Sequence, residues 1–505
     1  MPLLKKLLFG YVAIWFVLAG LSLARYISIW KGTCYFQTMG WLWCVSEPER
    51  LARIGSAAGI AGMFTLFLAV GWLLWKHRDQ LVNLNPVLKK LLLVSGVCAV
   101  FILPLGMSDW PHYFSAGKAV SNHINPYVEQ WTHQVDFSDP MYKGALIGFS
   151  YGPVMATVFK WLYMASQGRP EGFLLIWKFV MLLVLIGAGV ITMKLVKLFS
   201  DGKDAAPYYL LWFAQPIFLF EWVVNVHFDG LWLLFLLLAI YAARAKRWWL
   251  VFPALIIGVW IKYIPILLLP FFALWWWQEL NWQNWKKLLS QMGLGLGIAG
   301  LISVLSWWPY WAGPQVFSSL VLQSKWVAWS WFGVIYYSLK PLFMWFLGDQ
   351  THWYLTRLAQ GFLLAVFIFT LYPMIKKCLA ILFKKARWED GEYVQAMIIF
   401  LLAYLLIWQK SFTPWYGAWF IPLGLIAFQK YRHPYMMKII TWFSSAAFIF
   451  HIVFIIDWFS KDPGAGGQLW FNYLIVGSIV MYPLYLIFRW RQKNYAASEV
   501  VEIKV

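Results

Sequence analysis

Asp109 is the side chain in this sequence that is best placed to act as a base. It closes an apolar run in 103-LPLGMSDWPHYFSAGKAVSNHINPY-127. A carboxylate at such a depth is partly desolvated, which makes it a stronger base. The alternative is an ordinary helix start, because Ser108 and Asp109 precede Pro111. The spacing alone favours neither interpretation.

A second acidic position lies in the short turn 225-NVHFDG-230, between two further apolar runs. So short a turn is expected to hold His227 and Asp229 at one end of the helices that it joins. There they could bind a ligand, although two residues are too few for a metal site. The alternative is turn chemistry, in which Asp-Gly reverses the chain.

Three lysines lie beside aromatic residues where apolar runs end. Lys262 is costly there unless it meets an anion, such as a lipid phosphate, or extends its side chain to the membrane interface. Lys325 lies among several tryptophans, and Lys410 belongs to a group that would suit a sugar phosphate. That group is Gln409, Lys410, Trp415 and Tyr416. Interfacial anchoring by the aromatic rings explains both segments equally well.

The composition identifies an integral membrane protein. Of 505 residues, 62% are hydrophobic and only 12% are charged, whereas a soluble domain carries about 25% charged residues. A run such as 228-FDGLWLLFLLLAIYAA-243 suits lipid, where a helix satisfies its own backbone hydrogen bonds. Most of the 37 tryptophans are expected in interfacial belts. The predicted fold is therefore all-α and polytopic, with about 14 transmembrane helices.

Basic residues fix the predicted orientation. With a cytoplasmic N-terminus, nearly every basic cluster falls in a cytoplasmic connection, as the positive-inside rule requires, and the C-terminal tail is cytoplasmic too. The net charge of +20 is thus an orientation signal, and we expect membrane lipids and no nucleic acid as partners. The outer side receives the large segments 25–52, 107–171 and 309–353. Within the second, residues 151–165 are expected to form a helix along the outer interface.

The predicted organisation is a single membrane domain over 1–505. It consists of two additional spans with an outer loop (1–87), a core (88–430), and C-terminal spans with a tail (431–505). Cys34 and Cys44 share the first outer loop, where a disulfide is plausible, with two unpaired thiols as the alternative.

Several motifs are absent from the sequence. It contains no Gly-rich phosphate loop, no HExxH and no nucleophile elbow. The apolar runs also lack the several acidic residues of a proton relay. Because the ionisable residues gather at the outer face, an enzyme acting on lipid-borne substrates fits better than a carrier.

The order of these segments resembles the GT-C superfamily of membrane glycosyltransferases. It is more closely similar to bacterial mannosyltransferases that use polyprenyl-phosphate mannose, and to the glycosylphosphatidylinositol mannosyltransferases. Asp109 matches the family's acidic residue at the outer end of an early span, and 112-HYFSAGKAVSNHINPY-127 its "Tyr, small residues, Asn-Pro-Tyr" pattern. The stretch 150-SYGPVMATVF-159 resembles the family's "Tyr-Pro-Pro" helix, and HFDG, IKYIPILLLP and TPWYGAWFIPLG follow in family order. The chain departs by its two extra N-terminal spans and by Gly152 in place of the first proline.

The resemblance implies an inverting hexosyl transfer, most often of mannose, from a polyprenyl-phosphate sugar to a lipid or cell-envelope glycan. Asp109 would be the base, and Lys262, Lys410 and Lys325 would bind the lipid phosphate. The implied substrate-binding residues are His112, Tyr113, Asn125, Tyr127, Tyr151, His227, Asp229, Trp415 and Tyr416.

The same resemblance implies a site on the outer face of the plasma (inner) membrane, with no cofactor and no indicated divalent metal. Two alternatives remain: a transporter or flippase of a lipid-linked saccharide, and a non-catalytic assembly subunit. The sequence leaves the sugar, the acceptor and the oligomeric state open.

Overall fold

The structure is a computed structural model, and nearly all of the residues that it describes are helical. These residues are 6, 9–20, 22, 34–36, 42–44, 62, 65, 85–104, 109–128, 149–200, 216–324, 330–411, 413–431 and 485. The only strands among them are β1 (Cys34–Phe36) and β2 (Leu42–Cys44), which form a small antiparallel hairpin. The prediction of an all-α fold therefore holds for the described residues apart from this hairpin.

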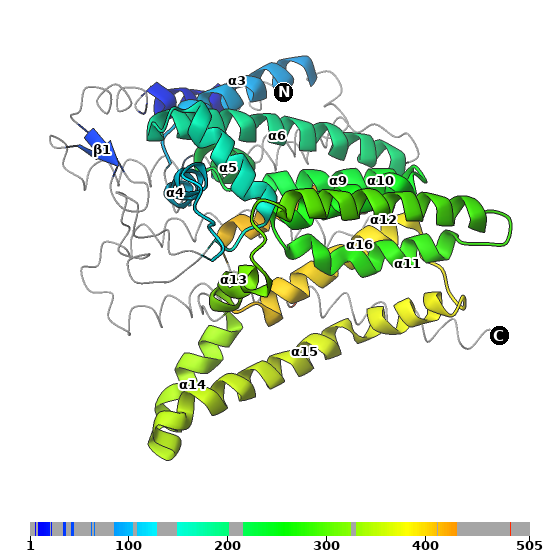
Figure 1. The fold of residues 1–505 in the computed structure, drawn as a ribbon. Coiled ribbons are helices and arrows are strands. Elements are labelled where there is room, and N and C mark those ends of the chain that lie inside the picture. Colours follow the sequence, from blue (N-terminus) through cyan, green and yellow to red (C-terminus); the bar gives the residue numbers. More distant parts are fainter. Residues whose placement is uncertain are drawn as a thin grey trace. The chain divides into compact units, whose positions relative to one another are not determined.

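The chain divides into two compact units. The first comprises Met1–Leu269 and Gln283–Gln323, and the second comprises Pro270–Trp282 and Ser324–Val505. The helices of the first unit are α3 (Asn85–Phe101), α4 (Trp110–Ser121), α5 (Pro153–Ala165), α6 (Pro170–Phe199), α8 (Pro216–Phe218), η4 (Leu219–Val224), α9 (Asp229–Arg244), α10 (Trp248–Ile261), η5 (Ile264–Leu268), α12 (Trp285–Trp307), η6 (Pro314–Phe317) and α13 (Ser318–Gln323). Helix α10 packs between α9 and α12, and α9 also packs on α6 (Figure 1).

In the first unit, α6 and α9 end where α10 and α12 begin, so the basic residues of the four helices lie at one end. The Arg244 guanidinium, at the end of α9, donates to the Leu198 carbonyl at the end of α6. The backbone N–H of Trp248, at the start of α10, donates to the Gln291 side chain in the first turns of α12. This end of the helices also carries Lys194, Lys197, Lys246, Arg247, Lys286 and Lys287. Within this unit, the helix directions agree with the alternation that the charge pattern predicted.

Short helices cover the opposite end of these four helices. Helix α4 packs against α5, and α5 also contacts α6, α10 and α12 (Figure 1). The helix predicted over residues 151–165 is present as α5, which begins at Pro153. Proline suits the first turn of a helix because its missing N–H would have no intrahelical partner there. The candidate site lies at this end of the unit.

The second unit is also helical. It contains α11 (Leu269–Glu279), most of which belongs to this unit, α14 (Trp331–Leu347), η7 (Gly348–Gln350), α15 (Thr351–Leu382), α16 (Asp390–Ala403), η8 (Tyr404–Trp408), η9 (Pro414–Trp419) and α17 (Phe420–Tyr431). A capping box of Glu389 and Glu392 starts α16. The Trp275 and Tyr393 rings stack at 4.9 Å, and the Trp275 indole donates to Asp390.

Four helical stretches among the described residues are long and apolar enough to cross a membrane. They are Pro170–Phe199, Trp285–Trp307, Trp331–Leu382 and Asp390–Trp408, and a pair bent by 118°, Pro216–Val224 with Asp229–Arg244, gives up to five. These helices fit a membrane protein. The count of about 14 stays a prediction, because several predicted spans are shorter helices or lie outside the described residues. The predicted outer segment 309–353 includes the apolar helix α14, which packs against α15.

The first outer loop is described only at β1 and β2. Their register pairs the backbones of Cys34 and Cys44. The disulfide between these two residues stays a prediction.

Candidate active site

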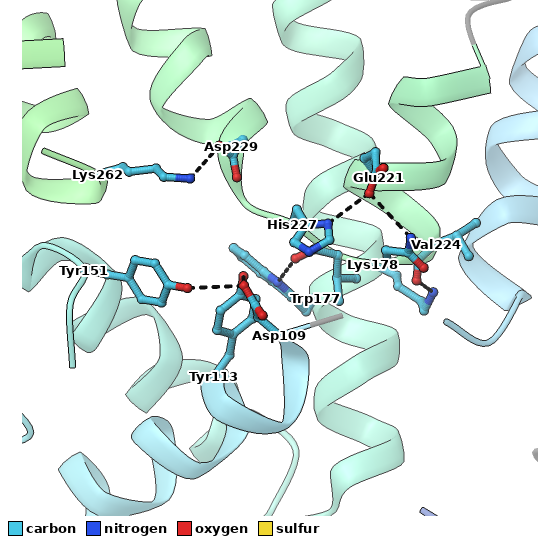
Figure 2. Close-up of polar contacts among 12 residues, drawn as sticks. Asp109, Tyr113, Tyr151, Trp177, Lys178, Glu221, Val224, His227, Asp229 and Lys262 are labelled. Carbon is cyan, nitrogen blue, oxygen red and sulfur yellow. Dashed lines mark hydrogen bonds and ion pairs between the residues drawn. The ribbon is translucent and has the colours of Figure 1, made fainter. Parts of the chain in front are cut away.

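Asp109 stands at the start of α4, but its carboxylate does not cap the helix. The residue occupies the N-cap position, followed by Trp110 and Pro111, and makes no side-chain capping bond. Instead, Asp109 Oδ2 accepts long hydrogen bonds from the hydroxyls of Tyr113 at 3.4 Å and Tyr151 at 3.3 Å (Figure 2). The helix-start alternative thus describes where the residue sits, while its carboxylate is turned toward two phenols.

Tyr151 is fixed through its own backbone. Its carbonyl oxygen accepts hydrogen bonds from the hydroxyls of Tyr127, at 3.0 Å, and Tyr263, at 3.3 Å. Burial, with smaller effects from neighbouring tyrosines, raises the pKa of Tyr127 well above its usual range, so its hydroxyl stays protonated and able to donate. The Asp109 carboxylate is therefore joined by hydrogen bonds to α4, to the start of α5 and to the segment after α10.

Gly152 allows α5 to approach the end of α10. Its backbone N–H donates to the Ile261 carbonyl at 3.2 Å. A Cβ at this position would lie 2.0 Å from the carbonyl oxygen of Trp260. Proline would have no N–H to donate and would bring such a carbon. Glycine replaces the first proline of the "Tyr-Pro-Pro" pattern at a position where only glycine fits this contact.

His112 contributes an aromatic ring beside Asp109. It stacks on Phe149, with ring centroids 6.3 Å apart, and lies edge-on to Tyr151 at 6.1 Å. Burial lowers the pKa of His112 to about 4, and the nearby Asp109 charge offsets only part of that effect. The imidazole is accordingly neutral near pH 7.

Asp229 and Lys262 form an ion pair close to these residues. Lys262 Nζ lies 2.7 Å from Asp229 Oδ1, and the side chains are 15% and 3% exposed. Lys262 therefore meets a carboxylate of its own chain, and its binding of a lipid phosphate stays a prediction. Asp229 opens α9, where the positive end of the helix dipole favours a carboxylate.

The ring of Phe228 contacts both the Asp229–Lys262 ion pair and the two tyrosines that donate to Asp109. Its centroid lies 4.7 Å from that of Tyr151 and 5.3 Å from that of Tyr113. Lys262 Nζ lies 5.8 Å from the same centroid. The structure thus brings the predicted residues Asp109, Tyr113, Tyr151, Asp229 and Lys262 into one site (Figure 2).

His227 faces away from this group and contacts a buried carboxylate. Its Nδ1 lies 3.1 Å from Glu221 Oε2, and both side chains are fully or almost fully buried. Asn225 donates to the same carboxylate oxygen at 3.5 Å.

Two residues here were missed by reasoning from sequence. Glu221 and Lys178 are both buried, and each lies inside a run that was assigned as an apolar span. The available signal was a single charged residue within such a run, which is costly in lipid unless it has a partner.

Asn125 fixes the segment that follows α4. Its amide donates to the Tyr310 carbonyl at 2.9 Å, and its side-chain oxygen accepts from the Tyr127 backbone N–H at 3.1 Å. Tyr127 also packs on Trp307, with centroids 5.1 Å apart. Asn125 and Tyr127 thereby tie this segment to the end of α12.

The remaining predicted residues belong to the second unit. Lys410 Nζ lies 5.0 Å from the Phe332 ring centroid, and burial lowers the pKa of Lys410. Trp415 is buried, and the Tyr416 ring packs on Trp419 with centroids 4.4 Å apart. Lys325 lies outside the described residues. In the described part of the chain, no group of three or more His, Cys, Asp or Glu side chains could hold a metal ion.

A family profile covers the whole of the site described in the first unit. The family described as alpha-(1->6)-mannopyranosyltransferase, N-terminal domain (MptA_B), matches residues 7–278, more than half of the 505 residues. The chain belongs to the MptA_B family. As a member of a mannosyltransferase family, it is a glycosyltransferase. The MptA_B match includes the N-terminal runs that departed from the GT-C pattern, as well as Asp109, Asp229 and Lys262. No curated protein matches the chain.

Proposed function

We propose that this protein transfers mannose, with inversion, from polyprenyl-phosphate mannose to a hydroxyl of a lipid or cell-envelope glycan. The observation that carries the proposal is the Asp109 carboxylate, which does not cap helix α4 and shares a site with the Asp229–Lys262 ion pair. Family membership supplies the transferred sugar class. The name of the family suggests the 6-hydroxyl of an acceptor sugar as the attacking group.

The reaction needs a base at the acceptor and a cation at the leaving group. Asp109 takes the proton from the acceptor hydroxyl as its oxygen forms a bond to C1 of mannose. The bond from C1 to the phosphate oxygen breaks on the opposite face, and the polyprenyl phosphate leaves with the electron pair. The hydroxyls of Tyr113 and Tyr151 keep the carboxylate turned toward the acceptor.

Lys262 is the proposed cation for the departing phosphate. A positive charge fixed before the reaction stabilises charge that develops on the leaving oxygen. Asp229 holds the ammonium in place and orients the sugar, whereas His227, which is buried against Glu221, is not proposed to contact the sugar. Within the first unit, His112, Asn125 and Tyr127 are proposed to line the substrate path. Lys325, Lys410, Trp415 and Tyr416 belong to the second unit, and their binding of the lipid phosphate or the sugar stays a prediction.

The site is proposed to face the outside of the plasma membrane, with both termini in the cytoplasm. The separation of basic residues from Asp109, at opposite ends of the helices in the first unit, supports this orientation. A donor activated by a lipid phosphate needs no nucleotide and no cofactor there.

Donor specificity tests the proposal. Purified protein in proteoliposomes is given radiolabelled polyprenyl-phosphate mannose or GDP-mannose, together with a mannosylated lipid acceptor. We expect label to enter the acceptor from the lipid donor alone, with the α-configuration at the new bond. Transfer from GDP-mannose alone would contradict the proposed donor. Movement of labelled lipid across the bilayer without transfer would favour the flippase alternative.

A further inference from the structure

The turn that carries His227 and Asp229 has a strained backbone. Val226 adopts a φ of 57°, in the left-handed region that β-branched residues rarely enter. The residue is fully buried, and the helices on either side of the turn are bent by 118° relative to each other. Such a conformation persists only where its surroundings enforce it.

Two consecutive residues of α6 contact this turn. The Trp177 indole N–H donates to the carbonyl of Val226 at 3.2 Å. Lys178 Nζ donates to the Val223 carbonyl at 3.1 Å and also to the Val224 carbonyl (Figure 2). These are the last two carbonyls of η4, where the helix break removes the partners that a continuing helix would supply.

Lys178 also reaches the segment that leads to Asp109. Its Nζ donates to the Ile102 carbonyl, just after the end of α3, at 2.7 Å. Three carbonyl acceptors match the three N–H donors of a lysine ammonium group. One buried lysine therefore ties together the two chain segments that precede Asp109 and His227.

The held turn sets the direction of three side chains of the site. The His227 backbone N–H donates to the Glu221 carbonyl at 2.8 Å, and its ring contacts the Glu221 carboxylate. Phe228 then lies against Tyr151, and Asp229 meets Lys262. A relaxed Val226 would change the direction of every one of these residues.

We propose that Trp177 and Lys178 are positioning residues that hold the strained turn at 225–228 and so fix His227 and Asp229. Their effect on transfer rests on the proposed function. Their effect on the conformation of the turn does not.

Trp177→Phe is the deciding variant, since it removes the indole N–H and keeps an aromatic ring. Trp161→Phe is its control, because Trp161 lies on α5 with 62% of its side chain exposed. In mannosyl transfer, we expect Trp177→Phe to lower kcat about tenfold with a smaller change in the KM for donor, and Trp161→Phe to change neither. A purely structural role would lower the folded fraction and leave kcat per folded enzyme unchanged, which would overturn the proposal.

A second readout does not depend on activity. In ¹⁵N-histidine-labelled protein, the His227 signal is assigned by its loss in His227→Gln, and Trp177→Phe is expected to shift that signal. An unshifted signal would overturn the proposal even if the enzyme were active. If wild-type protein transfers no sugar, the proposed function fails while the histidine spectrum still decides the positioning role.

Lys178→Met tests the second residue against Lys194→Met, which removes an exposed lysine from the same helix. We expect Lys178→Met to shift the His227 signal and to lower kcat more than Trp177→Phe does. Lys194→Met should have the His227 signal and the kcat of wild type. If Lys178→Met does not fold, Lys178→Arg, which keeps a cation with N–H donors, gives the same comparison. An Lys178 variant that folds with an unshifted His227 signal and an unchanged kcat would overturn its part of the proposal.

Discussion

At the scale of single residues, the site pairs a carboxylate bonded by two phenols, the proposed base, with a lysine held by a second carboxylate. The two hydroxyls that reach Asp109 among the described residues both bond to Oδ2. Under the proposed mechanism, Oδ1 is the oxygen that would receive the acceptor proton. Asp229 is buried and Lys262 is 15% exposed, so each partner compensates a charge that would be costly alone.

Lys262→Met should separate the structural role of this pair from its role in catalysis. The variant leaves the buried Asp229 carboxylate without its lysine and is expected to lose about 3 kcal/mol of unfolding free energy. Adding Asp229→Asn should restore most of that stability without restoring transfer, because the phosphate still lacks its cation. Unfolding in a titration of denaturing detergent and the transfer rate measure the two effects.

The Lys377–Glu392 pair is a matched control, with the same 2.7 Å separation but side chains 41% and 27% exposed. Lys377→Met should cost less than about 1 kcal/mol. Recovery of transfer in the Lys262→Met/Asp229→Asn double variant would show that Lys262 only neutralises Asp229.

The low pKa of His112 predicts a loss of stability in acid. Its pKa is about 4 in the folded protein against an ordinary 6.5, so the unfolded chain takes up the proton first. Stability should therefore fall as the pH drops from about 6.5 to about 4, with no further contribution from this residue below that. The thermal midpoint of His112→Gln should fall less over this range than that of wild type. The exposed His123, changed to Gln, provides the control, and identical pH profiles for wild type and His112→Gln would contradict the account.

At the scale of elements, the site depends on the close approach of α5 to the end of α10. Gly152 bonds to the Ile261 carbonyl while Tyr151, one residue earlier, reaches Asp109. Lys262 follows Ile261 directly, so one contact between the two elements fixes both the phenol and the cation.

Gly152→Ala should break this contact. The added Cβ would meet backbone atoms of Trp260, and such overpacking costs roughly 1–3 kcal/mol or more. We expect a lower thermal midpoint and a large loss of transfer. Gly293→Ala, on α12 with no atom within 4 Å of the added Cβ, should keep wild-type transfer and should not lower the thermal midpoint, because alanine favours a helix more than glycine does. Wild-type activity in Gly152→Ala would show that the approach of α5 to α10 does not position the site.

The elements were predictable where charge and hydropathy change together. The turn between α9 and α10 and the position of Asp229 at the start of α9 follow from such changes. The turn after η4 was predicted from the sequence, but the contacts that hold it were not, because the last carbonyls of η4 are satisfied by Lys178 from another helix, a partner that no local pattern reveals. The apolar helix α14 was assigned to an outer connection because the spans were chosen so that basic clusters fall on one side. Such a choice gives no information about helices within a connection. The close approach of Gly152 to the Trp260 backbone was not predictable either, because it depends on tertiary packing. From the sequence, Gly152 was only a position where the family pattern has proline.

At the scale of the whole molecule, the orientation in the membrane is the main expectation to test. In the first unit, the basic ends of α6, α9, α10 and α12 lie opposite the end that carries Asp109. Single cysteines at His123 and Ala245, both exposed, can be introduced after the four native cysteines are changed to serine. A membrane-impermeant maleimide should label His123→Cys in intact cells, and Ala245→Cys only after permeabilisation. The reverse pattern would contradict the proposed outer site.

The most direct test of the central claim is the rate of mannosyl transfer from polyprenyl-phosphate mannose by Asp109→Asn. The asparagine keeps the size of the side chain but cannot take the acceptor proton, so kcat should fall by about a hundredfold or more. Asp349→Asn, at an exposed aspartate of the second unit, should transfer at the wild-type rate. If Asp109→Asn, folded as well as wild type, transfers mannose equally fast, Asp109 is not the base and the proposed mechanism is wrong.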